Sequence, residues 1–315
     1  MGFFASLINS MPSAVAQGLI WGIMAIGVYL TYRILDVADL TVDGSLGTGG
    51  AVCVVMVLNG APVGLALLVA TAAGMLAGLV TGLFHTACGI PAILAGILTQ
   101  LALYSVNLRI MGFGTGGGKA NLPISVDKYS LLVSARYVRN VALNNPILIL
   151  AVFCVVLIAV LYWFFGTELG CSLRATGANQ NMARAQGINT NVTTVLGLMI
   201  SNGLVALAGG LLAQYQGFSD INMGRGAIVI GLAAVIIGEV IFSRIFRNFA
   251  LKLLSAVIGA IIYYIVMVFV LRLGLSTDDL KLLTALVVAL FLTIPYWKGK
   301  YFTKTSVKKG EKNHA

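Results

Sequence analysis

The sequence predicts an all-α polytopic membrane protein with about nine transmembrane helices. Of its 315 residues, 59% are hydrophobic and 10% are charged, and the mean hydropathy is +0.98. Soluble domains typically contain about 25% charged residues. Several windows also exceed the roughly 18–20 apolar residues that a helix needs to cross a bilayer. The 37 glycines supply positions where such helices can approach closely or break.

Four of the expected helices precede residue 112. The third follows a turn, Asn59-Gly60-Ala61-Pro62, and the fourth has Pro91 in its first turn, where the missing N–H costs nothing. The four helices are expected at residues 14–35, about 46–58, 63–84 and 91–111.

The second of these helices is expected to be discontinuous. The segment before it, DVADLTVDGSLGTGG, carries three aspartates and leads directly into the apolar run 53–58, which is too short to cross a bilayer unaided. The helix must therefore begin inside the membrane, after Asp43-Gly44-Ser45. Non-helical backbone at that depth is tolerated only where it lines a cavity or is buried in protein.

The rest of the chain is expected to complete a single membrane domain. A long exterior loop, 112–145, is interpreted as a docking or capping surface, and a fifth helix at 146–165 links two halves at about 14–111 and 192–297. The later helices are expected at 192–214, 227–242, 251–270 and 282–295, before a basic tail at 298–315.

The two halves are predicted to form an inverted repeat. DLTVDGSLGTGGAVCVV, from Asp39, is similar to DINMGRGAIVIGLAAVI, from Asp220. Each has an acid, then glycines, then a helix of Gly, Ala and Val. The first copy follows an inward-running helix and the second an outward-running one. Transporters place substrate paths at the broken helices of such repeats, near the midplane.

The net charge of +10 does not indicate nucleic-acid binding. Six of the twenty basic residues lie in the tail 298–315. A basic tail after a last helix is favoured on the cytoplasmic side, where anionic lipid headgroups attract it. We therefore expect a protein of the cell membrane whose C-terminus lies in the cytoplasm.

Several chemical functions are excluded by context. The glycines of GFGTGGG, at 112–118, follow a membrane helix rather than the strand that a dinucleotide site requires. His85 and Cys88 lack two further zinc ligands, so no metal site is expected. No catalytic constellation is evident, and the chain is expected not to be an enzyme.

Polar residues in the apolar segments are candidates for a translocation path. Thr99, Gln100, Tyr104 and Asn107 repeat along one helical stripe. Such a stripe lines a water-filled path or hydrogen-bonds a neighbouring helix, and the sequence leaves both open. The candidate path residues are Asp43, Gln100, Tyr104, Asn107, Asn202 and Gln214.

Glu239 is the one acid deep in an apolar run. Because a charge inside a bilayer is costly, it is expected to pair with Arg244 or Arg247. The alternative is a proton-coupling role in a secondary transporter.

A polar segment at 166–191 lies between two strongly apolar helices, and we call it the coupling loop. Asn179 is suited to cap a short helix through Gln186, and Gly187 suits the left-handed residue that ends it. The chain has neither a phosphate-binding loop nor an ion-coupling cluster, so energy for transport must arrive through a partner at this loop.

The coupling loop carries a family resemblance. Its residues resemble the cytoplasmic loop of ABC importer permeases, in the branched-chain amino acid/ribose permease superfamily. The resemblance rests on Glu168-Leu169-Gly170, on Leu173-Arg174-Ala175-x-Gly177-x-Asn179 and on Ala183 through Gly187-Ile188-Asn189. DLTVDGS, GLAAVIIGEVIF and TDDLKLLTALVVAL are similar to a narrower branch, the tryptophan/tyrosine-type permeases. Permeases of the superfamily often have an asparagine-histidine-like stretch where Asp39 to Asp43 stand, and this departure argues against a branched-chain substrate.

The resemblance implies an ATP-driven importer of a small solute, an aromatic or branched-chain amino acid, that works by alternating access. Its partners would be two cytoplasmic ATPases that bind ATP and Mg, an extracytoplasmic substrate-binding lipoprotein and a second permease copy. The alternatives are an ion-coupled secondary transporter and an ABC permease for a sugar or nucleoside. The loop residues expected to meet the ATPase are Glu168, Leu173, Arg174, Ala175, Gly177, Asn179, Met182, Ala183, Arg184 and Gly187.

Overall fold

The protein is a bundle of apolar helices. The computed structural model describes residues 3–114, 117–125, 128–129, 131–138, 145–242, 245–246, 248–272, 282, 284–286, 288–290 and 293. Within these residues, six helices are long and apolar enough to span a membrane. They are α1 (Phe3–Tyr29, continued by the π-helical turn η1, Leu30–Ile34), α3 (Val63–Thr86), α4 (Ala92–Met111), α5 (Pro146–Phe165), α8 (Thr190–Gln216) and α10 (Phe249–Arg272).

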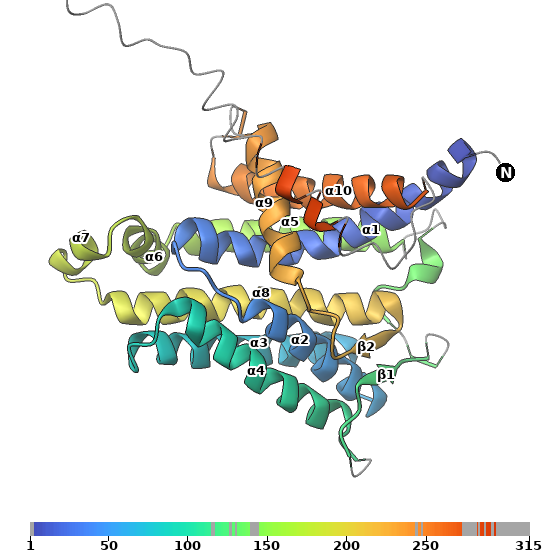
Figure 1. Ribbon diagram of the computed structural model, residues 1–315, viewed down its shortest axis with the longest axis horizontal. Coiled ribbons are helices and arrows are strands. Elements are labelled where there is room, and N and C mark those ends of the chain that lie inside the picture. Colours follow the sequence, from blue (N-terminus) through green and yellow to red (C-terminus); the bar gives the residue numbers. More distant parts are fainter. Residues whose placement is uncertain are drawn as a thin grey trace, which may run out of the picture.

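Two shorter apolar helices, α2 (Val42–Leu58) and α9 (Ala227–Phe242), complete this set. Two further helices, α6 (Glu168–Ala178) and α7 (Gln180–Ala185), form one end of the molecule (Figure 1). The predicted all-α polytopic fold is therefore confirmed. Of the expected helix at 282–295, the described residues are helical, and the tail 298–315 lies outside the described residues.

The short helices begin in the middle of the bundle rather than at its ends. α1 runs towards the α6–α7 end, and segment 35–41 returns from there to the start of α2 (Figure 1). α8 runs away from the α6–α7 end, and segment 217–226 returns from the far end to the start of α9. The helices that precede the two copies, α1 and α8, thus run in opposite directions, as the sequence analysis expected for them (Figure 1).

The discontinuity before α2 lies earlier than the sequence suggested. α2 begins at Val42 and runs unbroken through the glycines to Leu58, so the helix includes Asp43-Gly44-Ser45 instead of following it. The irregular backbone is segment 35–41, where Asp36 has a positive φ of 54°. Aspartate tolerates this left-handed conformation better than most residues do. The aspartates therefore shape the turn and the helix start.

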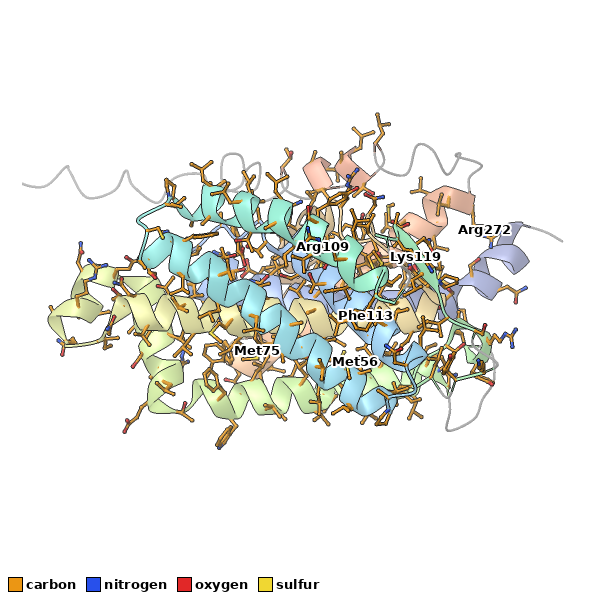
Figure 2. All side chains as sticks on the ribbon, turned by 90° about the horizontal axis from the view of Figure 1, so that it is seen from below. Met56, Met75, Arg109, Phe113, Lys119 and Arg272 are labelled. Carbon is orange, nitrogen blue, oxygen red and sulfur yellow. The ribbon has the colours of Figure 1, made fainter. Side chains whose placement is uncertain are left out.

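The exterior loop 112–145 is tied to the second irregular segment. Its strand β1 (Asn121–Pro123) pairs antiparallel with β2 (Phe218–Asp220), with Leu122 opposite Ser219. A short 3-10 turn, η2 (Ala135–Tyr137), follows. Phe113 and Lys119 lie in the half of the molecule away from α6 and α7 (Figure 2). The described parts of this loop therefore cover the far end of the bundle.

Glycine spacing brings α3 against α8. Gly74, Gly78 and Gly82 recur every fourth residue, so they share one face of α3. A Cβ at Gly74 would overlap the backbone of Asn202, and one at Gly78 that of Leu198. Small residues allow this close backbone approach between membrane helices. The α3–α8 contact therefore depends on three glycines in register.

We predict that Gly78→Ala lowers the thermal unfolding midpoint of the purified protein in detergent. The added methyl group must displace the α8 backbone, and overpacking of this kind costs about 1–3 kcal/mol. The matched control is Gly64→Ala, in the same helix, because nothing lies within 4 Å of a Cβ at that position. Equal midpoints for both variants would show that the glycine face does not set the packing.

Candidate functional site

The starts of the two short helices meet through one carboxylate. Asp43, in the first turn of α2, accepts hydrogen bonds from the backbone N–H groups of Gly226 (2.9 Å) and Ile228 (2.9 Å) at the start of α9. The first N–H groups of a helix have no acceptor within the helix, and a negative charge there is favourable. A Cβ at Gly224 would overlap the Asp43 backbone carbonyl. Asp43 thus caps a helix of the opposite half.

A second buried network fixes segment 35–41 to α8. The Asp39 carboxylate accepts from the Thr41 backbone N–H (2.9 Å) and from the Asn202 side-chain amide (2.6 Å). The Asn202 side-chain oxygen in turn accepts from the Ser45 hydroxyl (2.6 Å). Asp39 and Asn202 are almost completely buried. Asn202, a candidate path residue, therefore serves here as a bridge between α8 and the first broken helix.

Three threonines connect the same segment to α3 and α4. The Thr41 hydroxyl is 2.7 Å from that of Thr81, which donates to the Thr99 hydroxyl at 2.9 Å. A Cβ at Gly96 would meet the Leu40 backbone nitrogen at 2.8 Å, so glycine permits the contact. The polar stripe on α4 was expected either to line a water-filled path or to hydrogen-bond a neighbouring helix, and Thr99 does the latter.

The other stripe residues occupy different surroundings. Gln100 is half-buried, Tyr104 is 42% exposed and Asn107 is 2% exposed. The Asn107 amide donates to the Gly44 carbonyl at 3.4 Å, and its side-chain oxygen finds no partner among the described residues. A Cβ at Gly44 would meet the Gln100 Cα at 3.2 Å. The start of α2 thus gathers Asp43, Asn202, Asn107 and the backbone of Gln100.

Gln214 lies apart from this cluster. Its side-chain oxygen accepts from the Leu132 backbone N–H at 3.2 Å, and its amide donates to the Cys53 thiol at 3.3 Å. The side chain is fully buried. Gln214 therefore joins the exterior loop to α2 and α8, and it is not exposed to a path in this conformation.

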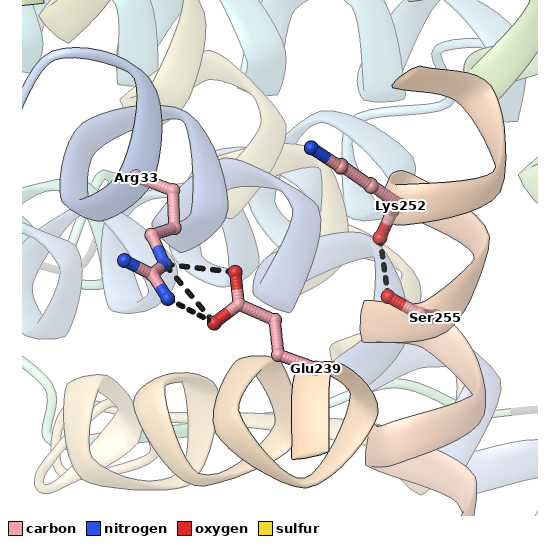
Figure 3. Close-up of polar contacts among 4 residues, drawn as sticks. All are labelled: Arg33, Glu239, Lys252 and Ser255. Carbon is pink, nitrogen blue, oxygen red and sulfur yellow. Dashed lines mark hydrogen bonds and ion pairs between the residues drawn. The ribbon is translucent and has the colours of Figure 1, made fainter. Parts of the chain in front are cut away.

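Glu239 pairs with a residue that the sequence analysis did not consider. The Nε of Arg33 donates to both carboxylate oxygens of Glu239, at 2.7 and 3.0 Å, and a second guanidinium nitrogen also bonds to it (Figure 3). The expected partners Arg244 and Arg247 lie outside the described residues. Arg33 is far from Glu239 in sequence but adjacent to it in space, so spacing along the chain did not reveal this pair. The bond joins η1 to α9.

The coupling loop has the predicted cap and terminator, and one more helix than expected. The Asn179 side chain accepts from the Met182 backbone N–H at 3.1 Å and begins α7, and Gly187 has the left-handed φ of 81°. The segment before it, for which the sequence analysis predicted no helix, forms α6, which begins after Thr167. The Thr167 hydroxyl accepts from the Gly170 backbone N–H at 3.4 Å.

One face of the coupling loop is anchored to the bundle. Leu173 is 1% exposed and Ala183 is 3% exposed, so these two residues, expected to meet a partner, pack within the chain instead. A Cβ at Gly177 would overlap the Ile34 carbonyl, and the Thr176 hydroxyl lies 2.8 Å from that of Thr193. The exposed members of the predicted set are Glu168, Arg174, Ala175, Asn179, Met182, Arg184 and Gly187.

Sequence reasoning did not select Asp39, Ser45, Thr41 or Thr81 as site residues. The sequence pattern around the three hydroxyl residues gave little indication of a site, because serines and threonines in apolar helices commonly bond their own backbone. What distinguishes them is a partner on another helix, which spacing along one helix does not reveal.

We predict that Asp43→Ala destabilises the protein and slows transport, because two N–H groups at the start of α9 lose their acceptor. Loss of a helix cap costs about 0.5–2 kcal/mol. Asp43→Asn retains one acceptor oxygen and should lose less. Thermal unfolding and substrate uptake check this, and an Asp43→Ala protein as stable as the parent would contradict the capping role.

A double-mutant cycle tests the Arg33–Glu239 pair. Because the two side chains are 51% and 25% exposed, we expect a coupling energy of only about 0.2–1 kcal/mol between Arg33→Ala and Glu239→Ala. Unfolding midpoints of the parent, both single variants and the double variant provide the measurement. Strictly additive effects would show that the pair contributes no coupling.

Comparisons with known proteins agree with this architecture. Residues 10–294 match the family model described as "Branched-chain amino acid transport system / permease component". The chain is 41% identical over 284 residues to the "Tyrosine transport system permease protein" of Clostridioides difficile (strain R20291), which covers 90% of both chains. It is 31% identical over 245 residues to the "Autoinducer 2 import system permease protein LsrC" of Yersinia pseudotuberculosis serotype O:1b (strain IP 31758), covering 76% of this chain and 64% of that one.

Among solved structures, PsaBC from Streptococcus pneumoniae in complex with Fab has a similar fold. The TM-score is 0.51 at 16% sequence identity, over 95% of this chain and 98% of that chain. At this identity the likeness concerns the fold alone. Together with the family match over most of the chain, the helical architecture leads to one conclusion: this protein belongs to the family of branched-chain amino acid transport system permease components.

Proposed function

We propose that this chain is the membrane-spanning permease subunit of an ATP-driven importer in the cell membrane, and that it carries an aromatic amino acid, with tyrosine as the first candidate. The observation that carries the substrate proposal is the 41% identity, over 90% of both chains, to a permease whose name states tyrosine transport. A branched-chain amino acid is the second candidate, from the description of the family.

The coupling loop supports the proposal that an external ATPase drives transport. α6 and α7 lie together at one end of the bundle, with one face buried against it and the other exposed (Figure 1). The exposed face includes Ala175, Asn179 and Met182, the last of which is 64% exposed. We assign this face, with Arg184, to the contact with a cytoplasmic ATPase, which binds the ATP and Mg.

The anchored face explains how force would reach the centre. Gly177 packs on η1 at the end of α1, while Thr176 bonds to Thr193 near the start of α8. α1 and α8 are the helices that lead into the two irregular segments before α2 and α9. Movement of α6 would therefore act on both broken helices, and alternating access would follow from their rearrangement.

The complete importer would contain partners besides this chain. A permease pathway needs two membrane halves around it, so we assign a second copy of this chain, and an extracytoplasmic binding protein would deliver the substrate. The loop 112–145 and strands β1 and β2 lie at the end opposite α6 and α7, where that protein would dock. The C-terminus would then lie in the cytoplasm.

Reconstitution tests the energy source and the substrate. With its binding protein and ATPase in liposomes, the chain should take up tyrosine only when ATP is present on the ATPase side. Unlabelled phenylalanine and leucine in excess measure selectivity. Uptake by the purified chain alone, driven by a proton gradient, would instead support an ion-coupled secondary transporter and overturn the proposal.

A single substitution tests the ATPase surface. We predict that Met182→Glu reduces ATPase co-purification and ATP-driven uptake at least tenfold, because it places a charge on an exposed apolar contact. Burying one unpaired charge costs several kcal/mol. The matched control for ATPase co-purification is Phe113→Glu, since Phe113 is 77% exposed but lies in the opposite half of the molecule. Unchanged ATPase binding in Met182→Glu would remove this face from the interface.

A further inference from the structure

A pocket of about 570 Å³ lies where α5 ends, α6 passes and α10 begins. Half of its lining residues are aromatic, and Arg174 supplies its charge. The lining residues are Tyr162, Trp163, Phe165, Gly166, Thr167, Arg174, Asn248 and Phe249. It shares no residue with the starts of α2 and α9, where the candidate path residues gather. The pocket is therefore a separate feature of the α6–α7 end.

Arg174 is turned towards the bundle rather than along the exposed face of the coupling loop. One guanidinium nitrogen donates to the Phe165 carbonyl at 2.6 Å, and the guanidinium carbon lies 5.8 Å from the centre of the Phe249 ring. These contacts hold the planar group at the pocket. Within the described residues Arg174 forms no ion pair with a carboxylate. Its charge thus faces the pocket without an anionic partner there.

The pocket lies at the boundary between hydrocarbon and water. α5 ends at Phe165 and α10 begins at Phe249, and both helices are long and apolar enough to span the membrane. Tyr162 is 57% exposed and Trp163 is 72% exposed. Aromatic residues at the ends of membrane helices typically lie at the level of the lipid headgroups. A ligand in this pocket therefore meets both environments.

We propose that this pocket binds the headgroup phosphate of an anionic phospholipid, with phosphatidylglycerol as the probe. The Arg174 guanidinium would donate to the phosphate, as its fork geometry favours. Trp163 and Tyr162 would contact the glycerol backbone and the first methylene groups. Charge complementarity and the aromatic wall favour a lipid over a free phosphate ion, which leaves apolar surface uncovered.

The bound lipid would connect three elements. α5, α6 and α10 each contribute to the pocket, so one headgroup would hold the coupling loop to two membrane helices. This assigns Arg174 to a lipid in place of the contact with the ATPase that the sequence analysis expected, and it does not depend on which solute is transported.

Native mass spectrometry of the full chain provides the test. The protein is released from micelles that contain equal amounts of phosphatidylglycerol and phosphatidylcholine with the same acyl chains. It should retain about fivefold more phosphatidylglycerol than phosphatidylcholine, as expected for one basic residue at a lipid surface. Arg174→Gln should abolish this preference, while Arg174→Lys should keep part of it. The preference should persist in excess inorganic phosphate.

The matched control is Arg184→Gln, which removes an equal charge from the same loop. Arg184 donates to the Thr190 hydroxyl at 2.7 Å and does not line the pocket. The Arg184→Gln variant should leave lipid retention unchanged. Thermal unfolding checks that each variant is folded. The proposal is overturned by equal retention of both lipids, by equal losses in both Gln variants, or by displacement of the lipid by inorganic phosphate. Loss of ATPase binding by Arg174→Gln in purely neutral lipid would also overturn it, because the arginine would then serve a protein partner.

Discussion

Irregular backbone inside a membrane must find all of its hydrogen-bond partners within the protein, because lipid supplies none. This constraint organises the centre of the molecule. Two segments, 35–41 and 217–226, interrupt the helices there, and each leads to a short helix that begins inside the bundle. The Asp43 carboxylate, in the first turn of the helix after one break, accepts from two N–H groups at the end of the other break and the start of α9.

The same constraint explains the glycines and the buried hydroxyls. Polar groups of segment 35–41 reach Asn202 and Thr81 only because neighbouring helices approach closely. Gly96 admits the backbone of the segment against α4, and the glycine face of α3 brings that helix against α8. The hydrogen bonds between helices require this close packing, so we expect a larger residue at one of these glycines to disturb the hydrogen bonds as well.

The two ends of the bundle make different contacts with its middle. At one end α6 contacts both η1 and α8, so it is connected to the two helices that precede the breaks. At the other end β1 and β2 join the exterior loop to the second break. Both ends of the bundle are therefore connected to its middle through direct contacts. This arrangement suits a membrane protein that responds to partners on both sides.

The sequence by itself determined what short-range chemistry decides. Apolar length set the helices, Asn179 and Gly187 marked the ends of α7, and the glycine-rich stretch after Asp39 predicted a break near α2. Tertiary structure decided which polar groups meet. The partners of Asp39, Asp43 and Glu239 on other helices lie 163, 183–185 and 206 residues away in the chain. No local pattern specifies such pairs, because only the packing of distant helices brings them within hydrogen-bond distance.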